Sequence, residues 1–594
     1  MTNSNTQKNK KNHNNTVNNY DLVIIGGGIA GLYTLYKLSK KYTHLKILLL
    51  ETGQRLGGRI YSYKETIDKQ EYVMDLGAGR LGYHHKLINN LINELGLKPK
   101  IIPIPNTKTY IEVRDNKAIN KTSTKDYIMD KLTKFFFSPQ VSKLGKSTKQ
   151  SYYLYEFLTK YVSASFSRAV KDVFEYSSDL NELNAYDAIE YFKYDYTKSA
   201  EFFTLNGGLE QIIDQLVVAI KKTQGYNSNN IKLVNLSNVE NITYKNNNID
   251  DLFEMSVTNY NSKGSGSKKI YSKHVICAIP KKSLTQFTIF KPLLSELNSI
   301  NSINLLRIYE IYDKDKDKDK DKDKDKDKDK DKDKDKDKEQ NSGTVWFKNI
   351  EKTITNTNVQ FVIPINPDNG LIMSSYSDCA NARYWNNLLA SKGLDYVKVK
   401  LNEKLNLLYS IYNIKVPLSK YIKMYFWDAG VACWKKNVDS DYLSSKLLNP
   451  YPRVFIIGEN YSKYQAWCEG ALMTSESCIA KLVKILAKTK TKTLKRSIKR
   501  GKSKLQIEDT TLGGSEKKTF TLGEVKKHNK KNDAWTIIEN KVYDITTWIP
   551  THPGGDVILK AVGKNGTRLF KSVNHPSFVK ENVLPKYYIG NLSK

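Results

Sequence analysis

Residues 21–51 constrain the fold of this chain more than any other stretch, and they read DLVIIGGGIAGLYTLYKLSKKYTHLKILLLE. A short apolar run, 22–25, is followed at once by glycines, which is typical of a strand buried on both faces of a parallel sheet. Three glycines at G-x-G-x-x-G spacing lead into a helical apolar pattern, and a second apolar run, 47–50, ends in Glu51. This order predicts a strand, turn, helix and strand that bind a dinucleotide.

Each part of this motif has a physical role in holding such a ligand. Gly26 permits the tight turn, Gly28 lets the backbone approach a pyrophosphate, and Gly31 lets the helix pack against the strand. Ala30 lies in the first helical turn, whose free N–H groups and positive dipole end favour phosphate. Glu51 can accept hydrogen bonds from ribose hydroxyls. The alternative is a tight strand-to-helix turn that binds nothing.

The bulk composition limits the partners that we expect. The 594 residues predict about three or four domains. The formal charge of +33 is concentrated in the N-terminal tail and near residues 488–518. Because no motif interleaves aromatic and basic residues to read bases, we interpret this charge as solvated tails and expect no nucleic-acid partner. The five cysteines include no C-x-x-C pair, which argues against a disulfide framework and a zinc site.

The polar N-terminal tail and the Asp-Lys insertion have too few apolar side chains to pack into a core. Residues 1–19 are rich in Asn and Lys, and residues 313–338 alternate Asp and Lys, so we expect both to be disordered. The N-terminus lacks the apolar segment of a signal peptide, and no apolar run reaches the roughly eighteen residues of a transmembrane helix. We therefore expect a soluble intracellular protein, in the cytoplasm or, if the chain is viral, in a virion.

Further glycine-rich stretches accompany the first motif: TGQRLGGR at 52–59, MDLGAGRLG at 74–82 and VFIIGENYSKYQAWCEGALMTSE at 454–476. Together they resemble the flavin-containing amine oxidase family, which includes monoamine oxidases, polyamine oxidases and flavin histone demethylases. The resemblance implies bound FAD. It also implies cofactor contacts from Arg55, Gly58, Arg59, Gly77, Ala78, Val239, Glu459, Glu469 and Ala471.

The resemblance implies an α/β fold in which a Rossmann-like FAD-binding domain is interleaved with an α+β substrate domain, all within residues 20–486. The FAD-binding parts are expected at about 20–100, 204–283 and 426–486, and the substrate-domain parts at about 101–203 and 284–425. In the family, two aromatic rings form a cage over the flavin, and their counterparts here are Trp434 and Trp467. Packing in a hydrophobic core is the alternative for each tryptophan.

Two further positions follow from the same resemblance. Cys433 matches the cysteine that carries the flavin covalently in monoamine oxidases, but the surrounding G-G-C-Y pattern is not kept. We therefore favour non-covalent FAD, with a covalent link through Cys433 as the alternative. Arg307 best matches a family lysine that holds a water near the flavin, and an arginine cannot act as a tunable base. A salt-bridged structural arginine is the alternative for Arg307.

The C-terminal part predicts a second redox module. Residues 487–518 are basic and poor in apolar residues, which indicates a linker. Residues 519–594 resemble cytochrome b5, a small α+β domain, along their whole length. The resemblance implies that His552, in an H-P-G-G turn, and His575 ligate haem b. The alternative is a degenerate copy of the domain that binds no haem. With two protein ligands the iron has no open position, so this module would carry electrons.

The combined hypothesis is an FAD-dependent amine oxidoreductase fused to a cytochrome b5 domain. It would oxidise the C–N bond of a small-molecule amine to an imine, which hydrolyses to a carbonyl compound and an amine. Electrons would pass to O₂, giving H₂O₂, or to the tethered haem or another redox partner. Two alternatives stay open: a desaturase or protoporphyrinogen-oxidase-like enzyme that oxidises C–C bonds, and a non-enzymatic redox or structural protein.

Overall fold

The computed structural model describes residues 19–196, 200–247, 250–260, 267–314, 343–503, 518–549, 552, 555–572, 584 and 587–593. The N-terminal tail and most of the Asp-Lys insertion, both expected to be disordered, lie outside these residues. The chain divides into a first unit that ends at Lys490 and a second that begins at Thr491. Across the described residues, no helix combines the length and apolar character needed to cross a membrane.

The predicted dinucleotide unit forms a parallel sheet with an antiparallel extension. Its strand order is β10-β2-β1-β13-β12-β11, and β19 pairs with the C-terminal end of β13. The strands are β1 (Asn19–Ile25), β2 (Ile47–Leu50), β10 (Ile231–Val234), β11 (Ser237–Asn247), β12 (Asp250–Asn259), β13 (Ser267–Cys277) and β19 (Val454–Ile456). The helices of this part are α1 (Ile29–Lys41), α2 (Lys86–Glu94), α10 (Gln211–Lys221), α11 (Gln224–Asn227) and α17 (Cys468–Ser503).

Strand β1 is buried on both faces, as the sequence predicts. Leu22 and Ile24 belong to the core shared with α1, α10 and α17, whereas Val23 and Ile25 belong to the core on the opposite face. Successive side chains of a strand point to opposite faces, so an unbroken apolar run fits a sheet covered on both sides. β13 pairs in parallel with β1, from Asn19 opposite Tyr271 to Ile25 opposite Cys277.

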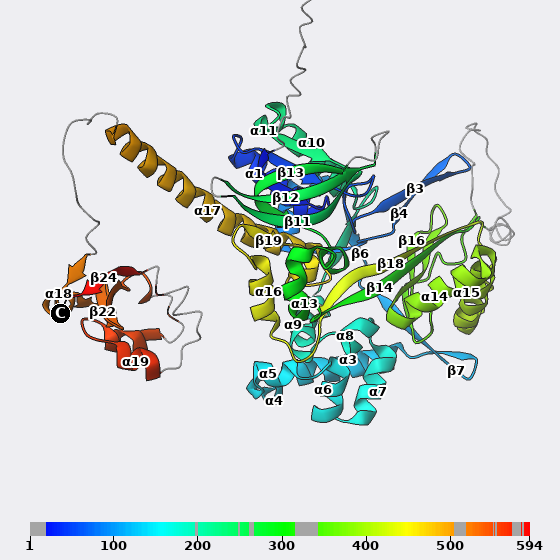
Figure 1. The fold of residues 1–594 in the computed structure, drawn as a ribbon. Coiled ribbons are helices and arrows are strands. Elements are labelled where there is room, and N and C mark those ends of the chain that lie inside the picture. The colour runs from blue at the N-terminus through cyan, green and yellow to red at the C-terminus, as the bar shows by residue number, and fades with distance from the viewer. Residues whose placement is uncertain are drawn as a thin grey trace, which may run out of the picture. The chain divides into compact units, whose positions relative to one another are not determined.

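A second, mixed sheet has the strand order β18-β14-β17-β16-β15-β7-β8. The strands are β7 (Lys108–Arg114), β8 (Lys117–Asn120), β14 (Ile300–Ile311), β15 (Lys352–Thr355), β16 (Phe361–Asn366), β17 (Leu371–Asp378) and β18 (Tyr421–Trp434). α14 (Cys379–Lys392) and α15 (Leu394–Tyr409) cover this sheet through a core that includes Leu306, Ile308, Trp385 and Leu401 (Figure 1).

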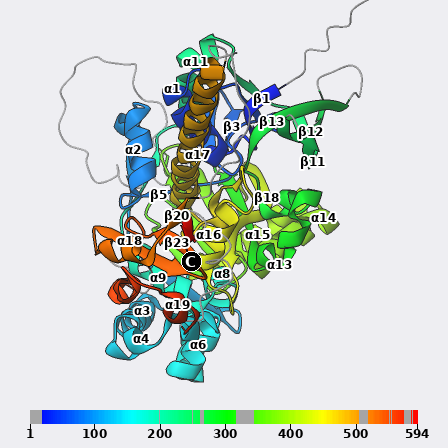
Figure 2. The ribbon, with the colours of Figure 1, turned by 60° about the vertical axis from the view of Figure 1, so that its left-hand side comes forward.

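A group of helices completes the first unit, at the end opposite α1 and α11 (Figures 1 and 2). These helices are α3 (Thr122–Phe136), α4 (Pro139–Lys143), α5 (Lys146–Gln150), α6 (Leu154–Tyr161), α7 (Ala164–Val173), α8 (Ser177–Asn181) and α9 (Ala185–Asp195). Smaller elements are β3 (Ser62–Ile67), β4 (Gln70–Asp75), β5 (Leu81–Gly82), β6 (Ile101–Ile104), β9 (Phe202–Leu205), α12 (Lys281–Leu284), α13 (Leu294–Leu297) and α16 (Ser440–Leu448), with short 3₁₀ turns between.

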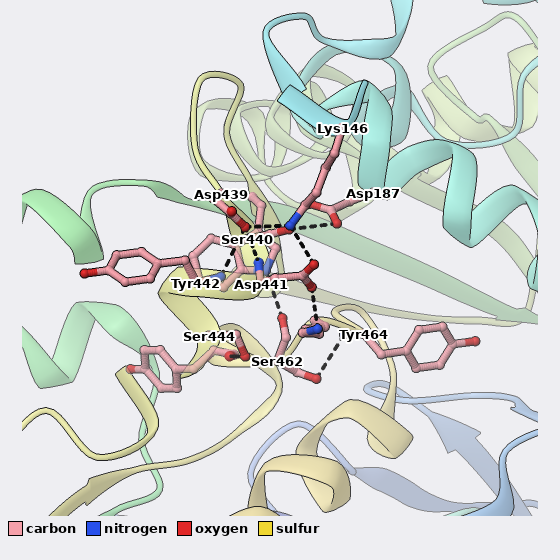
Figure 3. Close-up of polar contacts among 12 residues, drawn as sticks. Lys146, Asp187, Asp439, Ser440, Asp441, Tyr442, Ser444, Ser462 and Tyr464 are labelled. Carbon is pink, nitrogen blue, oxygen red and sulfur yellow. Dashed lines mark hydrogen bonds and ion pairs between the residues drawn. The ribbon is translucent and has the colours of Figure 1, made fainter. Parts of the chain in front are cut away.

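A polar cluster holds the start of α16 against the helical group (Figure 3). The Lys146 ammonium lies 2.7 Å from a carboxylate oxygen of Asp439 and 2.6 Å from one of Asp441. The Ser440 hydroxyl donates to the buried carboxylate of Asp187 at 2.9 Å. Burial raises the pKa of Asp187 to about 6. These contacts join the start of α16 to α5 across almost 300 positions of sequence and to α9 across 253.

The second unit is a small α+β domain. Its sheet has the order β20-β24-β23-β22-β21, from Thr519–Phe520, Tyr588–Leu592, Lys541–Asp544, Asp533–Ile538 and Asn529–Lys530 respectively. Its described residues include the helices α18 (Leu522–Lys527) and α19 (Thr567–Ser572). Thr521 and Glu524 form a capping box at the start of α18. The α+β prediction for this part is confirmed.

The structure of residues 487–518 differs in part from the linker that the sequence predicts. α17 continues through its first half to Ser503. The physical reason is composition, since Lys, Leu, Ile and Arg are good or acceptable helix formers and the segment contains no proline. Residues 504–517 lie outside the described part of the chain.

A buried carboxylate with three lysines joins the helical group to the mixed sheet. Glu175 is 3% exposed, and its oxygens lie 2.5 Å from the Lys108 ammonium, 3.0 Å from that of Lys352 and 3.7 Å from that of Lys125. Burial alone would raise the pKa of Glu175, but the three ammonium groups hold it well below its usual value. The folded state therefore gains stability that is present at neutral pH and lost as the pH falls through this lowered pKa.

Replacing Glu175 by Gln should strongly destabilise the first unit, because three buried or half-buried ammonium groups would lose their carboxylate. Breaking a buried ion pair from one side costs about 3–5 kcal/mol of unfolding free energy. Urea unfolding followed by intrinsic fluorescence measures this. The control Glu403→Gln, which removes an exposed pair with Lys400, should leave the midpoint unchanged. Equal midpoints for both variants would contradict the role of Glu175.

Candidate functional site

A cavity of about 2110 Å³ extends from the dinucleotide sheet to the mixed sheet. Its lining combines Gly28 and Glu51 of the first part with Arg307, Tyr376 and Trp467. Most of the site residues predicted from the sequence line this one cavity: Gly26, Gly28, Ala30, Glu51, Arg55, Gly58, Arg59, Gly77, Ala78, Val239, Arg307, Glu459, Trp467 and Ala471. The structure therefore brings together positions that are more than four hundred residues apart.

The packing of the protein itself requires two of the three glycines of the first motif. Gly26 has a positive φ of +109°, and a Cβ there would lie 2.4 Å from the carbonyl oxygen of Ala278. A Cβ on Gly31 would lie 2.1 Å from the carbonyl oxygen of Gly26, so Gly31 serves the close contact of helix and turn. Gly28 has ordinary backbone angles, and its Cβ would meet nothing within 4 Å. The protein itself does not require a glycine at Gly28, but a ligand in the cavity would.

The surroundings of Gly28 suit an anionic cofactor. Gly28 is the N-cap of α1, and neither a side-chain cap nor an acidic residue in the first turn neutralises this helix end. The Glu51 carboxylate accepts N–H bonds from Gly27 and Gly53, both at 2.7 Å, which fixes it at the edge of the same turn. Open space, free helix N–H groups and a positioned carboxylate fit the phosphates and ribose of a dinucleotide such as FAD.

The loop after Glu51 is held by its own arginines. Arg55 donates to the carbonyl oxygens of Leu56 and Ile60, both at 2.8 Å, and its guanidinium lies 4.3 Å from the centre of the Tyr61 ring. Arg59 donates to the carbonyl oxygen of Gly430 at 2.9 Å and to Glu459 at 2.5 Å. Their expected contacts with FAD remain predictions.

Glu459 is a structural junction as well as a cavity residue. Besides its ion pair with Arg59, its carboxylate accepts the N–H of Ala432 at 2.9 Å and that of Ala466 at 2.8 Å.

Gly77 packs so closely against the loop after Glu51 that a Cβ on it would lie 2.1 Å from the carbonyl oxygen of Arg59. Ala78 donates its N–H to the same oxygen.

The side chain of Glu469 does not reach the cavity. Its carboxylate accepts the N–H groups of Leu87 and Ile88, both at 2.9 Å, at the start of α2. A carboxylate at a helix N-terminus satisfies free donors and complements the dipole. The structure thus assigns Glu469 a helix-capping contact where a cofactor contact was expected.

The two-ring cage of Trp434 and Trp467 is wrong in its first member. Trp434 is fully buried in the main core, and its indole N–H donates to the carbonyl oxygen of Ser462 at 2.9 Å. Trp467 does line the cavity, where it stacks on Phe202 with ring centres 5.6 Å apart.

Cys433 lies next to Trp434 in the same core, 2% exposed, and is not among the residues that line the cavity. Burial raises the pKa of its thiol well above the usual value. The geometry therefore disfavours a covalent flavin link through Cys433, in line with the non-covalent preference.

Arg307 lies on β14 in the cavity wall and is 8% exposed. It donates to the carbonyl oxygen of Asp75 at 2.6 Å, and its guanidinium lies 4.6 Å from the centre of the Tyr376 ring. The salt bridge considered as the alternative for Arg307 is not found among the described residues.

Sequence reasoning missed several polar residues of the cavity wall. Arg80 follows the glycines of the 74–82 loop, and its guanidinium donates to the Tyr176 hydroxyl at 3.2 Å and lies 4.5 Å from the Phe202 ring centre. Asp195 accepts from the indole N–H of Trp467 at 2.9 Å. A lone arginine or aspartate carries no periodic signal, so only the tertiary structure shows these contacts.

Beside Asp195 lies a His84–His85 pair, and these three residues have the composition of a metal site. However, the Nδ1 atom of His85 accepts the N–H of Gly82 at 3.0 Å, which places the proton of the neutral ring on Nε2. Burial lowers the pKa of His85 to about 4. Its protonated Nε2 donates to the Tyr464 hydroxyl, 3.1 Å away, which satisfies the cluster without a metal ion.

The predicted haem ligands fall partly outside the described residues. In the second unit, His552 is half-buried and its ring centre lies 6.4 Å from that of Trp548. The core of this unit contains Ile545, Ile549 and Val562 close to His552 in sequence. His575 lies outside the described part of the chain, so its role remains a prediction.

Comparison with known proteins gives matches in both units of the chain. Residues 24–95 match the family described as NAD(P)-binding Rossmann-like domain, and residues 521–593 match the cytochrome b5-like heme/steroid binding domain. A cytochrome b5 of Nicotiana tabacum is 46% identical over 80 residues, which are 13% of this chain and 58% of that protein. Acyl-lipid (8-3)-desaturase B of Dictyostelium discoideum is 47% identical over 78 residues, which are 13% of this chain and 16% of the desaturase.

Solved structures resemble the first unit. A double mutant of putrescine oxidase has a TM-score of 0.53 at 12% identity, covering 78% of this chain and 99% of that one. A putative protoporphyrinogen oxidase from Exiguobacterium sp. 255-15 has a TM-score of 0.51 at 14% identity, covering 78% and 98%. At these identities the likeness shows the fold alone.

The chain joins a Rossmann-like fold, shared with the structures of these two oxidases, to a cytochrome b5-like domain. The α/β fold class and the fusion are thereby confirmed, and the two domains imply FAD and haem as cofactors. We call the two units the flavin unit and the b5 unit.

Gly28→Ala should impair FAD binding without unfolding the flavin unit, because the new methyl group meets only cavity space. A methyl group forced into a close ligand contact costs on the order of 1–3 kcal/mol, so bound FAD should fall about tenfold. Flavin content per purified protein and circular dichroism measure the two effects. Gly145→Ala, at a surface helix start with φ −58°, is the control. Unchanged flavin content in Gly28→Ala would refute the placement.

Proposed function

We propose that the flavin unit oxidises the C–N bond of a small-molecule amine. The observation that carries the proposal is the single cavity that runs from the Gly28 turn to a wall of aromatic rings. FAD, when bound, supplies the chemistry by accepting a hydride equivalent from the α-carbon of the amine. The amine becomes an imine, which water hydrolyses to a carbonyl compound and an amine. The fold likeness to putrescine oxidase supports this reaction class.

The residues of the cavity suit binding and exclusion of water. Tyr425 and Trp427 lie 4.9 Å apart between ring centres and line the cavity together with Tyr376 and Trp467. Such rings form an apolar surface that orients a small substrate and keeps water from the reacting C–H bond. No side-chain nucleophile is needed. Cys468, which also lines the cavity, has its pKa raised to about 12 by burial, so its thiol stays protonated.

Oxidation of a C–C bond is the second candidate, and the fold likeness to a putative protoporphyrinogen oxidase favours it. Both reactions use the same dinucleotide elements, and fold does not decide between them. The discriminating property is whether an amine can reduce the flavin.

An absorption spectrum of the purified protein, before and after a panel of amines is added without oxygen, tests the proposal. We expect flavin bands together with a sharp haem band, and bleaching of the flavin by one class of amine. The His552→Ala variant should lose the haem band and keep the bleaching. Flavin that no amine bleaches would favour C–C oxidation, and protein without flavin would leave a non-enzymatic role.

The reduced flavin would pass its electrons to O₂ or to the haem of the b5 unit. Covalent tethering raises the effective concentration of the haem, which supports the second route. Anaerobic stopped-flow mixing with a reducing amine should then show haem reduction after flavin bleaching, at a rate independent of protein concentration. Haem that stays oxidised after complete flavin bleaching would exclude this route and leave O₂ or a separate partner as acceptor.

A further inference from the structure

A chain of polar contacts leads from the cavity wall to the protein surface. Asp195, the last residue of α9, lines the cavity with a side chain that is only 6% exposed. One of its carboxylate oxygens lies 3.0 Å from Nε2 of His84, whose side chain is 30% exposed. A nearly buried acid of the cavity wall is therefore in direct contact with an imidazole that reaches solvent.

The neighbours of Asp195 hold its carboxylate in this position. Its second oxygen accepts the indole N–H of Trp467 at 2.9 Å, and its first also accepts the Tyr464 hydroxyl at 2.8 Å. The Tyr464 hydroxyl in turn lies 3.1 Å from Nε2 of His85. Because Trp467 lines the same cavity, the fixed carboxylate stands beside an aromatic face of the wall.

The two adjacent histidines differ in their ability to carry a proton. Burial lowers the pKa of His85 to about 4, and its Nδ1 atom accepts the N–H of Gly82, so this ring stays neutral. The His84 ring reaches solvent. An exposed imidazole exchanges protons near neutral pH, and it can gain a proton on one nitrogen while it loses one from the other. The geometry therefore singles out His84 as the link between Asp195 and water.

A second acid of the cavity wall lacks such a link. Asp179 lines the cavity and accepts the Tyr196 hydroxyl at 2.6 Å. Burial raises its pKa to about 7; the charge of Asp195 adds to this rise and that of Arg80 opposes it. Among the described residues, only Asp195 of these two acids contacts an exposed base.

Amine oxidation releases a proton that needs a route out of the cavity. At neutral pH an aliphatic amine is an ammonium ion. Its N–H bond must break before the α-carbon can give up a hydride equivalent, so each turnover yields a protonated imine, a hydride equivalent passed to FAD and one proton. Arg307 cannot take this proton because a guanidinium stays charged, and the Cys468 thiol is already protonated.

We propose that Asp195 accepts this proton and passes it through His84 to solvent. The ammonium group gives the proton to the carboxylate, the carboxyl group gives it to Nε2 of His84, and the exposed ring loses a proton to water. The carboxylate is then ready for the next turnover. This relay rests on the proposed amine oxidation, and it gives the flavin unit a proton acceptor in the cavity wall.

Chemical rescue of flavin bleaching tests the relay in the full-length holoprotein. Gln in place of His84 keeps an N–H donor for Asp195 but cannot carry a proton. With an amine that bleaches the flavin without oxygen, His84→Gln should slow bleaching about tenfold in weakly buffered solution, less than the loss of a complete acid–base residue because Asp195 stays in place. Added imidazole should restore the rate in a saturable manner. His44→Gln, the same change at an exposed histidine between α1 and β2, should behave as wild type.

Asp195→Asn removes the first acceptor and keeps an oxygen for the indole N–H of Trp467. It should slow bleaching about 100-fold, and imidazole should not restore the rate, because the exit is intact and the acceptor is missing. An unchanged rate in either Asp195→Asn or His84→Gln would overturn the relay. Slowing in His84→Gln that imidazole does not restore would make His84 a structural residue and overturn it as well.

Proton release without turnover separates the relay from the proposed function. tert-Butylamine has no hydrogen on its α-carbon, so it cannot be oxidised, and a pH-indicator dye follows the proton that it loses after mixing with the oxidised holoprotein. Release should be slower in His84→Gln than in wild type and His44→Gln. If release depends on His84 but no amine bleaches the flavin, the relay stands and amine oxidation fails. If amines bleach the flavin at rates independent of His84, amine oxidation stands and the relay fails. If neither release nor bleaching occurs, both proposals fall.

Discussion

The cavity depends on the buried carboxylate of Glu459. It is 5% exposed, and it joins Arg59, four hundred residues earlier, to the backbone N–H groups of Ala432 and Ala466. The loop after Glu51, the end of β18 and the segment before α17 meet at this one side chain. Because a buried carboxylate that loses its partners is strongly unfavourable, these three segments are held in one arrangement. Both halves of the cavity are built on that arrangement.

Buried cations of the flavin unit have two kinds of surroundings. Where cations hold segments together, as at Glu175 and Glu459, a carboxylate of the chain neutralises them. At Arg80 and Arg307, the guanidinium contacts found among the described residues are a tyrosine hydroxyl, a carbonyl oxygen and aromatic rings. The first unit therefore neutralises some of its buried cations with carboxylates and holds others by hydrogen bonds and ring contacts.

Local sequence signals predicted the dinucleotide part well, since a buried strand, a glycine turn and a helix start each follow from neighbouring residues. The same reasoning failed where long-range packing decides the outcome. Trp434 lies at the end of β18, where pairing with Ile300 of β14 places it in the core. Glu469 caps α2, an element almost four hundred residues away. Arg80 was overlooked because nothing in the neighbouring residues indicates that it meets Tyr176 and Phe202.

Arg307 shows how one substitution changes what a fold position can do. A lysine in this position can lose its proton and exchange it with a water, whereas a guanidinium stays charged under all ordinary conditions. In this chain the guanidinium is fixed by the carbonyl oxygen of Asp75 and the ring of Tyr376, so it presents a permanent, oriented positive charge to the cavity. Such a group takes no part in proton transfer, so any proton that a substrate loses in the cavity must go to another acceptor.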